Sequence, residues 1–213
     1  MSSRSQASRA KRRGTRLQRQ LKSPTEFLRP TPLDALRLAR RKFLAAERVN
    51  MSALANQLGV NRATLYRWVG SREQLLVEVV WSLGAQTLAN VDRAVRAKGA
   101  ERKGAERIVC VVTRFLEEVI SNQGLGRWVA EEGELAIRLL TGEDTEFQQR
   151  LVAAIEELLR EESDAGRLDL PVSLHEAAYA IVRLIESCTY LDFVTGEQPD
   201  ARWAESILRL LLR

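Results

Sequence analysis

The chain is built of amphipathic stretches separated by short breaks that carry glycine, proline or capping residues. Apolar residues recur every three or four positions, and this spacing gathers them on one face of an α-helix. Alternation with a period of two never extends beyond four residues, so ordinary strands are not expected. The pattern predicts an all-α fold whose helices lie within 33–47, 51–58, 62–69, 72–83, 105–122, 125–140, 146–165, 173–195 and 200–212.

Two positions in this pattern carry further expectations. Gly133 lies inside the stretch 125–140, where it predicts a break in the helix. Residues 91–104 are charged and punctuated by glycine, and we expect a connection between two domains there.

The net charge of +5 conceals a strong asymmetry along the chain. Residues 1–72 contain 17 Lys and Arg against three Asp and Glu, a net charge of +14. Residues 73–213 contain 16 against 25, a net charge of −9. A basic first third joined to an acidic remainder is typical of a module that binds a polyanion fused to a domain with another task.

The first residues form the most basic segment of the chain. Residues 1–22 hold eight Lys and Arg, no acid and almost no large apolar side chain. Such a segment cannot bury enough surface to offset the entropy of ordering it, so we expect a disordered basic arm over 1–31. The arm either adds contacts to DNA phosphates or a minor groove, or serves only as a solubilising tail.

Capping residues delimit two short helices joined by a tight turn. An asparagine precedes each helix as an N-cap, and a glycine follows each one. A Ser-x-x-Gln capping box then begins a longer helix. The residues in question are Asn50, Gly59, Asn61, Gly70, Ser71 and Gln74. Two helices in this arrangement form a helix-turn-helix when their apolar faces meet.

The second of these helices, 62–69, has two distinct faces. Leu65 lies on the apolar face, and Ala63 is at the centre of a polar, basic face. A small central residue lets a recognition helix approach the floor of a major groove about 12 Å wide. Arginines at the margins can bind guanine edges or phosphates, and hydroxyls can reach phosphate oxygens. We predict DNA contacts from Ser52, Asn61, Arg62, Ala63, Thr64, Tyr66, Arg67 and Arg72.

These residues also carry a resemblance to a known family. The stretch MSALANQLGVNRATLYRWVGSREQLLVEVV, residues 51–80, resembles the DNA-binding region of TetR-family transcriptional regulators. The shared features are Leu54-Ala55, Gly59-Val60, Asn61, Thr64-Leu65-Tyr66, Trp68 and Ser71-Arg72-Glu73-Gln74-Leu75. The family usually has a glycine in the turn after its first helix. This chain instead has residues 47–50, apparently one residue fewer, and its basic arm is longer than usual.

The resemblance implies a regulator with three parts. They are the arm 1–31, a three-helix helix-turn-helix domain 32–83, and an effector-binding and dimerisation domain 84–213. It further implies a homodimer that represses transcription at a palindromic double-stranded DNA operator and is released by a small-molecule effector. The whole chain is also similar to actinobacterial regulators of quorum-signal lactone degradation, which suggests a lactone or acyl-type effector.

Two apolar stripes suggest where a dimer would form. One follows the helix 146–165 and the other the helix 173–195, and together they could build a two-by-two helix interface. The alternative is that both stripes belong to the core of one monomer. The stripes consist of Phe147, Leu151, Ile155, Leu158 and Leu159, and of Leu174, Ala178, Ile181, Ile185 and Cys188.

An effector site in an all-helical domain is expected to be an apolar cavity with few polar groups. We predict that it is lined by aromatic and polar residues of the second domain, with Arg138 as a partner for a carboxyl or carbonyl group. The predicted residues are Phe115, Trp128, Arg138, Tyr179, Glu186, Cys188 and Tyr190.

Other classes of protein are less compatible with the sequence. Metal-ligand spacing, a nucleophile elbow and a phosphate-binding glycine loop are missing, so we expect no enzyme activity, cofactor or metal. A run of about 20 apolar residues and a signal-peptide core are also missing, which predicts a cytoplasmic protein without a membrane partner. Cys110 and Cys188 lie in apolar segments and fit reduced, buried thiols better than a disulfide. The remaining alternative is an architectural protein that binds DNA with little sequence preference.

Overall fold

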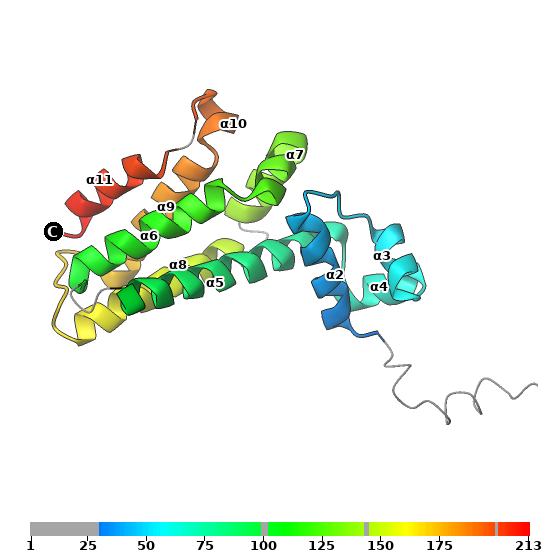
Figure 1. The fold of residues 1–213 in the computed structure, drawn as a ribbon, viewed down its shortest axis with the longest axis horizontal. Helices are drawn as coiled ribbons and strands as arrows, with labels where there is room; N and C mark the ends of the chain where they lie inside the picture. Colours follow the sequence, from blue (N-terminus) through cyan, green and yellow to red (C-terminus); the bar gives the residue numbers. More distant parts are fainter. Residues whose placement is uncertain (1–29, 99–101, 143–144, 199) are drawn as a thin grey trace, which may run out of the picture.

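The structure, a computed structural model, describes residues 30–98, 102–142, 145–198 and 200–213. Within these ranges it contains ten helices and no strand, which confirms the all-α prediction (Figure 1). The predicted arm lies almost wholly outside the described residues. The helices are α2 (Pro32–Leu44), α3 (Met51–Leu58), α4 (Arg62–Val69), α5 (Arg72–Lys98), α6 (Gly104–Ile120), α7 (Gln123–Thr141), α8 (Phe147–Asp164), α9 (Leu174–Thr189), α10 (Leu191–Thr195) and α11 (Ala201–Leu211).

The capping signals of the helix-turn-helix are confirmed at the atomic level. Asn50 Oδ1 accepts hydrogen bonds from the amides of the first turn of α3, and Asn61 Oδ1 accepts one from Thr64 N at 2.7 Å. Gly59 ends α3 in the left-handed conformation, at φ 68°. Ser71 and Gln74 exchange the two hydrogen bonds of a capping box. These bonds satisfy amides that the helix itself leaves unpaired.

The turn after α2 differs from the prediction. Helix α2 ends at Leu44, three residues before the predicted end, and the turn to α3 contains no glycine. Ala46 takes the left-handed conformation instead, at φ 51°, which costs an alanine about 1–2 kcal/mol. The Arg127 guanidinium donates a hydrogen bond to the Ala46 carbonyl and so helps to hold this strained residue in place.

Helix α5 is a single continuous element that joins both parts of the molecule. It extends to Lys98, so the predicted connection 91–104 is wrong for residues 91–98. The expected domain boundary after residue 83 also falls inside this helix. The charges that indicated a loop are paired, as shown by the 2.8 Å contact between Arg96 Nε and Asp92 Oδ2, while Val95 is buried.

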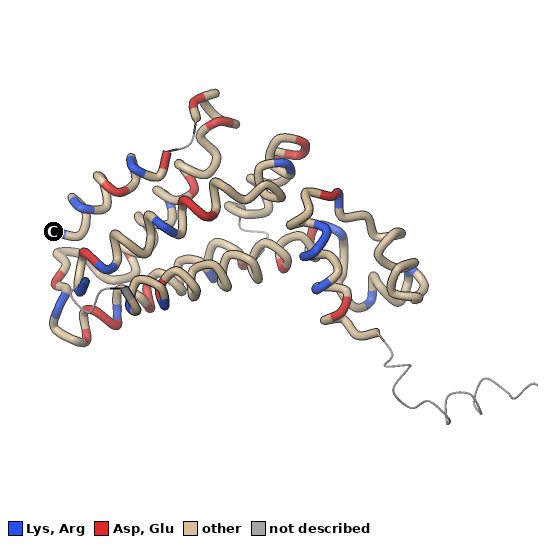
Figure 2. The backbone as a smooth tube through the Cα atoms, viewed as in Figure 1, with Lys and Arg blue, Asp and Glu red and all other residues tan. Residues whose placement is uncertain are grey.

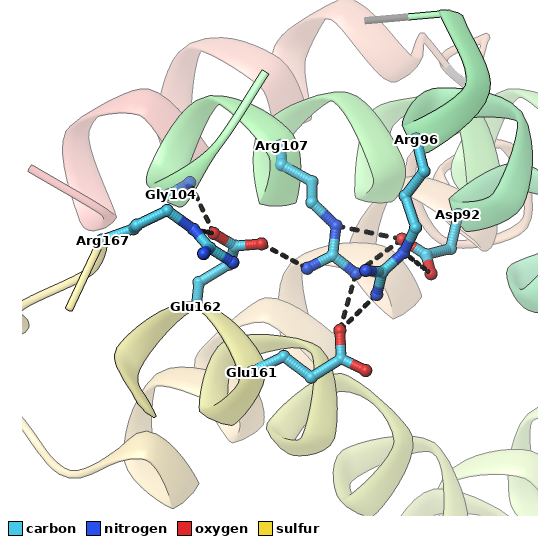
Figure 3. A network of polar contacts seen from close by, with 7 residues as sticks. All are labelled: Asp92, Arg96, Gly104, Arg107, Glu161, Glu162 and Arg167. Carbon is cyan, nitrogen blue, oxygen red and sulfur yellow. Dashed lines mark hydrogen bonds and ion pairs between the residues drawn. The ribbon is translucent and has the colours of Figure 1, made fainter. Parts of the chain in front are cut away.

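An ion-pair network anchors the far end of α5 to α6 and α8 (Figure 3). Arg107 on α6 is 3% exposed and donates to Asp92 on α5 at 2.7 Å, to Glu161 on α8 at 2.9 Å and to Glu162 at 2.5 Å. Glu162 also accepts from Arg167 Nε at 2.6 Å and from the Gly104 amide at 2.8 Å. Every oxygen of the buried Glu162 carboxylate therefore has a partner, as a buried charge requires.

Two predicted helices are interrupted. The break expected near Gly133 is present, because Glu132 has non-helical angles of φ −138° and ψ 41° inside α7. Gly133 lets the Phe193 ring of α10 approach: a Cβ there would lie 2.2 Å from a ring carbon. The stretch 173–195 forms two helices rather than one, since Tyr190 departs from helical geometry between α9 and α10.

The buried residues form two clusters. One lies among α5, α6, α8, α9 and α11 and is the core of the body. The other contains the core of the first three helices together with residues of α7 such as Trp128 and Leu140. Helix α2 of the DNA-binding domain thus packs on α7, and α5 joins this domain to the body.

The two stripes that suggested a dimer interface are mostly interior. Eight of the ten residues, such as Ile155 and Ile181, are buried within the monomer, where α8 packs on α9. The prediction that these stripes face a second subunit is therefore wrong, and the alternative of an ordinary monomer core holds for them. Within the described residues, every helix is too short or too polar to span a bilayer.

Candidate DNA interface and internal cavity

The helix-turn-helix lies at the end of the molecule opposite to the C-terminus (Figure 1). Leu54 and Ala55 of α3 and Leu65 of α4 are each completely buried, so the apolar faces of the two helices meet. Ala55 has only a methyl group, which lets the two backbones come close. This packing fixes which side of α4 is directed outward.

The outward side of α4 is the basic face that the sequence predicted. Arg62, Ala63 and Arg67 are exposed, and Tyr66 is 41% exposed. The Arg62 guanidinium lies 5.9 Å from the centre of the Tyr66 ring, which is a cation–π distance. Neither Arg62 nor Arg67 forms an ion pair with a described residue. Their charges are therefore free to bind an anion.

The remaining predicted residues of this surface have mixed roles. Thr64 and Ser52 are partly exposed at the starts of α4 and α3. Asn61 is exposed, but its Oδ1 is occupied by the cap of α4. Figure 2 shows further Lys and Arg residues on α2, among which Arg37 and Arg41 are exposed. Exposed arginines of this domain are thus not confined to the recognition helix.

Arg72 does not join this surface. Its Nη1 and Nη2 donate to both carboxylate oxygens of Glu132 at 2.8 and 2.7 Å, and its Nε donates to the Val49 carbonyl at 2.8 Å. Both side chains are 18% exposed. The prediction of a phosphate contact by Arg72 is replaced by a bidentate ion pair between the start of α5 and the kink of α7. This arginine lowers the pKa of the Glu132 carboxyl.

A cavity of about 80 Å³ lies between α2, α5, α6, α7, α8 and α9. Three predicted effector residues line it: Phe115, Glu186 and Tyr190. Most of the lining is apolar, which suits a hydrophobic ligand. Its volume is small beside the roughly 300–1,000 Å³ of most ligand pockets, so a bound effector would have to widen it.

The other four predicted effector residues lie elsewhere. Trp128 packs edge-on against the Phe43 ring in the core, with ring centres 6.0 Å apart. Cys188 is buried in the core of the body, and Arg138 is exposed on α7. Tyr179 is 47% exposed, with the Arg183 guanidinium 5.3 Å from its ring centre. The sequence identified the right helices for these residues, but not which face of each helix is turned to the cavity.

Sequence reasoning missed several residues of the cavity. Phe43 belongs to the helix-turn-helix part, and Thr87 lies in the segment of α5 beyond the predicted helix. Phe147 was assigned to a dimer stripe, but lines the cavity and packs edge-on against Trp81. Thr189 lies one turn of α9 after Ile185 and could have been found from that spacing.

Glu186 and Tyr190 are two of the polar residues that line the cavity. Burial raises the pKa of the Glu186 carboxyl, and the nearby Arg183 opposes this rise. Burial, and next the charge of Glu186, raise the pKa of the Tyr190 hydroxyl, which is therefore neutral. These two residues thus add one acidic group and one neutral hydroxyl to a lining that is mostly apolar.

Comparisons with known proteins give a consistent result. A family model described as "Tetracyclin repressor-like, C-terminal domain" matches residues 103–213. The chain is similar to the solved structure of the R. erythropolis transcriptional repressor QsdR from TetR family, with 29% identity and a TM-score of 0.75. This match covers 85% of the present chain and 93% of the other. No curated protein matches the sequence.

Two further solved structures share the fold. One is the TetR family repressor AlkX from Dietzia sp. strain DQ12-45-1b, implicated in biodegradation of n-alkanes, with 19% identity, a TM-score of 0.61, and coverage of 86% of this chain and 95% of that one. The other is the transcriptional regulator FadR from Bacillus subtilis in complex with stearoyl-CoA, with 16% identity, a TM-score of 0.55, and coverage of 84% and 97%.

Proposed function

Because this chain belongs to the TetR family of ligand-responsive, DNA-binding transcriptional regulators, we propose that it represses transcription as a homodimer on a palindromic operator and is released by a small effector. The observation that carries the proposal is the orientation of α4. Leu65 is buried while Ala63, Arg62 and Arg67 are exposed, as a helix that enters a major groove requires. A repressor acts on chromosomal DNA, so we place it in the cytoplasm.

The proposal is tested by measuring sequence preference. Duplexes selected from a randomised pool by the full chain should contain two inverted half-sites about 10 base pairs apart, one helical turn. Binding to the selected duplex should exceed binding to a scrambled one by at least about 10³-fold at the same salt concentration. A ratio near one would instead favour the alternative of an architectural DNA-binding protein.

The surface that supports the dimer lies on the last helix. Helix α11 buries Ala204 and Leu208 against the body, while its other face exposes Trp203 at 50%, Ile207 at 50% and Leu210 at 65%. Three large apolar residues at positions i, i+4 and i+7 form a stripe that is costly to leave in water. A second copy presenting the same stripe would cover it by a two-fold axis.

Changing Ile207 to Glu is expected to convert the dimer to a monomer, because it places two carboxylates at the centre of an apolar interface. Operator affinity should fall at least about tenfold, since each monomer engages only one half-site. Analytical ultracentrifugation and operator binding measure the two effects. Val194→Glu on α10 is the matched control: Val194 is 70% exposed and lies outside the stripe, so it should leave the dimer intact.

We expect the ion pair of Arg72 with Glu132 to couple effector binding in the cavity to DNA binding by α4. Glu132 is the kinked residue of α7, and α7 contributes Leu125 and Leu140 to the cavity. Arg72 begins α5 directly after the recognition helix. A ligand that widens the cavity would move α7, and the ion pair would transmit the shift to α4. The effector itself we propose to be a lactone or acyl-type molecule.

Changing Glu132 to Gln is expected to weaken this coupling, because the charge that holds Arg72 is removed while the shape is kept. The factor by which the effector weakens operator binding should fall, from the 5- to 150-fold typical of allosteric pairs towards one. Operator titrations with and without effector measure this factor. Glu131→Gln, which removes the exposed i,i+4 partner of Arg127, is the control and should leave the factor unchanged. If the effector weakens operator binding by the same factor in the parent, the Glu132 variant and the Glu131 variant, the ion pair does not couple the two sites.

A further inference from the structure

The cavity contains a buried acceptor that the protein leaves unused. Glu186 lines the cavity and is 9% exposed. Its Oε2 pairs with Arg183 Nη2 at 2.5 Å, but its Oε1 is buried and has no hydrogen-bond partner among the described residues. An unsatisfied buried carboxylate oxygen is costly. A ligand that donates a hydrogen bond to it would remove that cost.

The charges around the cavity restrict the ligand further. Among the residues that the structure describes, its lining includes two carboxylates, Glu186 and the exposed Glu118, and no Lys, Arg or His. Arg183 is the nearest cation named by the contacts of Glu186, and it is already engaged with that residue and with the Tyr179 ring. A carboxylate or phosphate head would therefore meet negative charge without a cation to balance it.

The neutral hydroxyl of Tyr190 adds a second polar group beside Glu186. A hydroxyl can donate to a carbonyl oxygen as well as accept a hydrogen bond. An uncharged head that both donates and accepts, such as an amide, can thus use both residues. The apolar remainder of the lining then receives the hydrocarbon part of the ligand.

We propose that the effector is an apolar molecule with a hydrogen-bond-donating head, such as an amide, hydroxyl or amine, that Glu186 Oε1 accepts, and that carboxylate-headed ligands are rejected. The inference rests on the proposed function, since it takes this cavity to be the effector site. A lactone meets the requirement when it carries an amide N–H or a hydroxyl group. A free fatty acid does not.

The test compares ligands that differ only in their head group. Octanamide, 1-octanol, octylamine, methyl octanoate and octanoate share one eight-carbon chain and are titrated into the full chain by calorimetry at pH 7.5. The three donor heads are expected to bind about ten- to a hundredfold more tightly than octanoate and the ester, which accept but do not donate. Equal affinity of octanoate and 1-octanol, or no binding by any donor head, would overturn the inference.

Two variants assign the preference to the proposed residue. Glu186→Leu should abolish the advantage of the amide and the alcohol over the ester. Glu186→Gln keeps the shape and an acceptor oxygen, so it should retain amide binding and lose about tenfold in octylamine affinity. If the Glu186→Leu variant does not fold, the Glu186→Gln variant alone tests the role of Glu186. Glu117→Gln, at an exposed residue of α6 outside the cavity lining, is the matched control and should leave all five affinities unchanged. An unchanged order of affinities in both Glu186 variants would refute the role of Glu186.

Failure of this inference is separable from failure of the proposed function. Operator selection, described above, requires no ligand. A protein that binds a palindromic duplex specifically but shows no preference for donor heads retains the proposed function and loses the inference. A protein that binds octanamide through Glu186 but no duplex specifically loses the proposed function instead.

Discussion

Replacing Arg62 or Arg67 by alanine is expected to weaken operator binding by about 1–3 kcal/mol for each bidentate base contact that is lost. Because a dimer presents each arginine twice, the loss for one substitution reaches about 2–6 kcal/mol per dimer on a palindrome. Both side chains are exposed on the outward face of α4 and free of ion pairs with described residues, so no internal contact has to be broken for them to bind DNA. Fluorescence anisotropy with the selected operator measures the effect.

The same titrations distinguish contacts to bases from contacts to phosphates. A lost base contact relaxes the base preference at one position of each half-site. A lost phosphate contact instead weakens binding to all duplexes alike and reduces the slope of log affinity against log salt concentration by about one. Arg93→Ala is the matched control, since Arg93 is exposed on α5 in the body and, among the described residues, bonds only to Asn90. Operator binding of both α4 variants that equals that of the control would show that α4 is not the recognition helix.

The helix-turn-helix could be predicted closely from the sequence because its signals are local. Asn50, Asn61 and the Ser71–Gln74 pair each cap a helix through atoms no more than three residues apart. The faces of α4 follow from the helical repeat once one side is known to be apolar. A short helix with one buried leucine leaves little freedom in how it is oriented.

The cavity and the pairing of charges could not be predicted, because they depend on contacts distant in sequence. Arg72 meets Glu132 across 60 residues, and Arg107 meets Glu162 across 55. In the sequence, Arg72 looks like a free cation beside a helix start. The charged residues near Asp92 look like a solvated loop. Only the packing of α5 on α6, α7 and α8 decides which of these side chains face one another.

The contacts at the two ends of α5 also bear on how the regulator responds to its effector. Near the DNA-binding part, the polar contact of α5 with α7 among the described residues is the ion pair of Arg72 with Glu132, which adds to the apolar packing of the second cluster. The far end of α5 is held by the network around Arg107. The near end has fewer polar contacts and lies beside the kink of α7. We therefore expect the far end to act as the fixed point about which the start of α5 shifts when the effector binds.

Replacing Arg107 by methionine is expected to lower the free energy of unfolding by about 3–5 kcal/mol at pH 7, because it leaves the buried Glu162 and the neighbouring Asp92 without their common cation. Urea unfolding measures this loss. Arg209→Met is the control: it removes an exposed ion pair with Glu106, which water screens, and should change the stability little. A loss in the Arg107 variant no larger than in this control would show that the network does not anchor α5.

The pH dependence of the Arg107→Met defect follows from Glu162, whose bonds to Arg167, Arg107 and Gly104 outweigh the effect of burial and lower its pKa to about 2 from the usual 4.5. A carboxyl whose pKa is lowered on folding contributes stability that is complete above pH 4.5 and is lost as the pH falls towards 2. The parent should therefore lose about 3 kcal/mol across this window, on the basis of about 1.4 kcal/mol per pH unit. In the variant the pKa of Glu162 lies closer to its ordinary value, so the loss is smaller and the two unfolding curves converge with acid. If the free energies of unfolding of the parent and the variant differ by the same amount from pH 7 to pH 2, the substitution destabilises the protein through lost packing rather than through lost charge pairing.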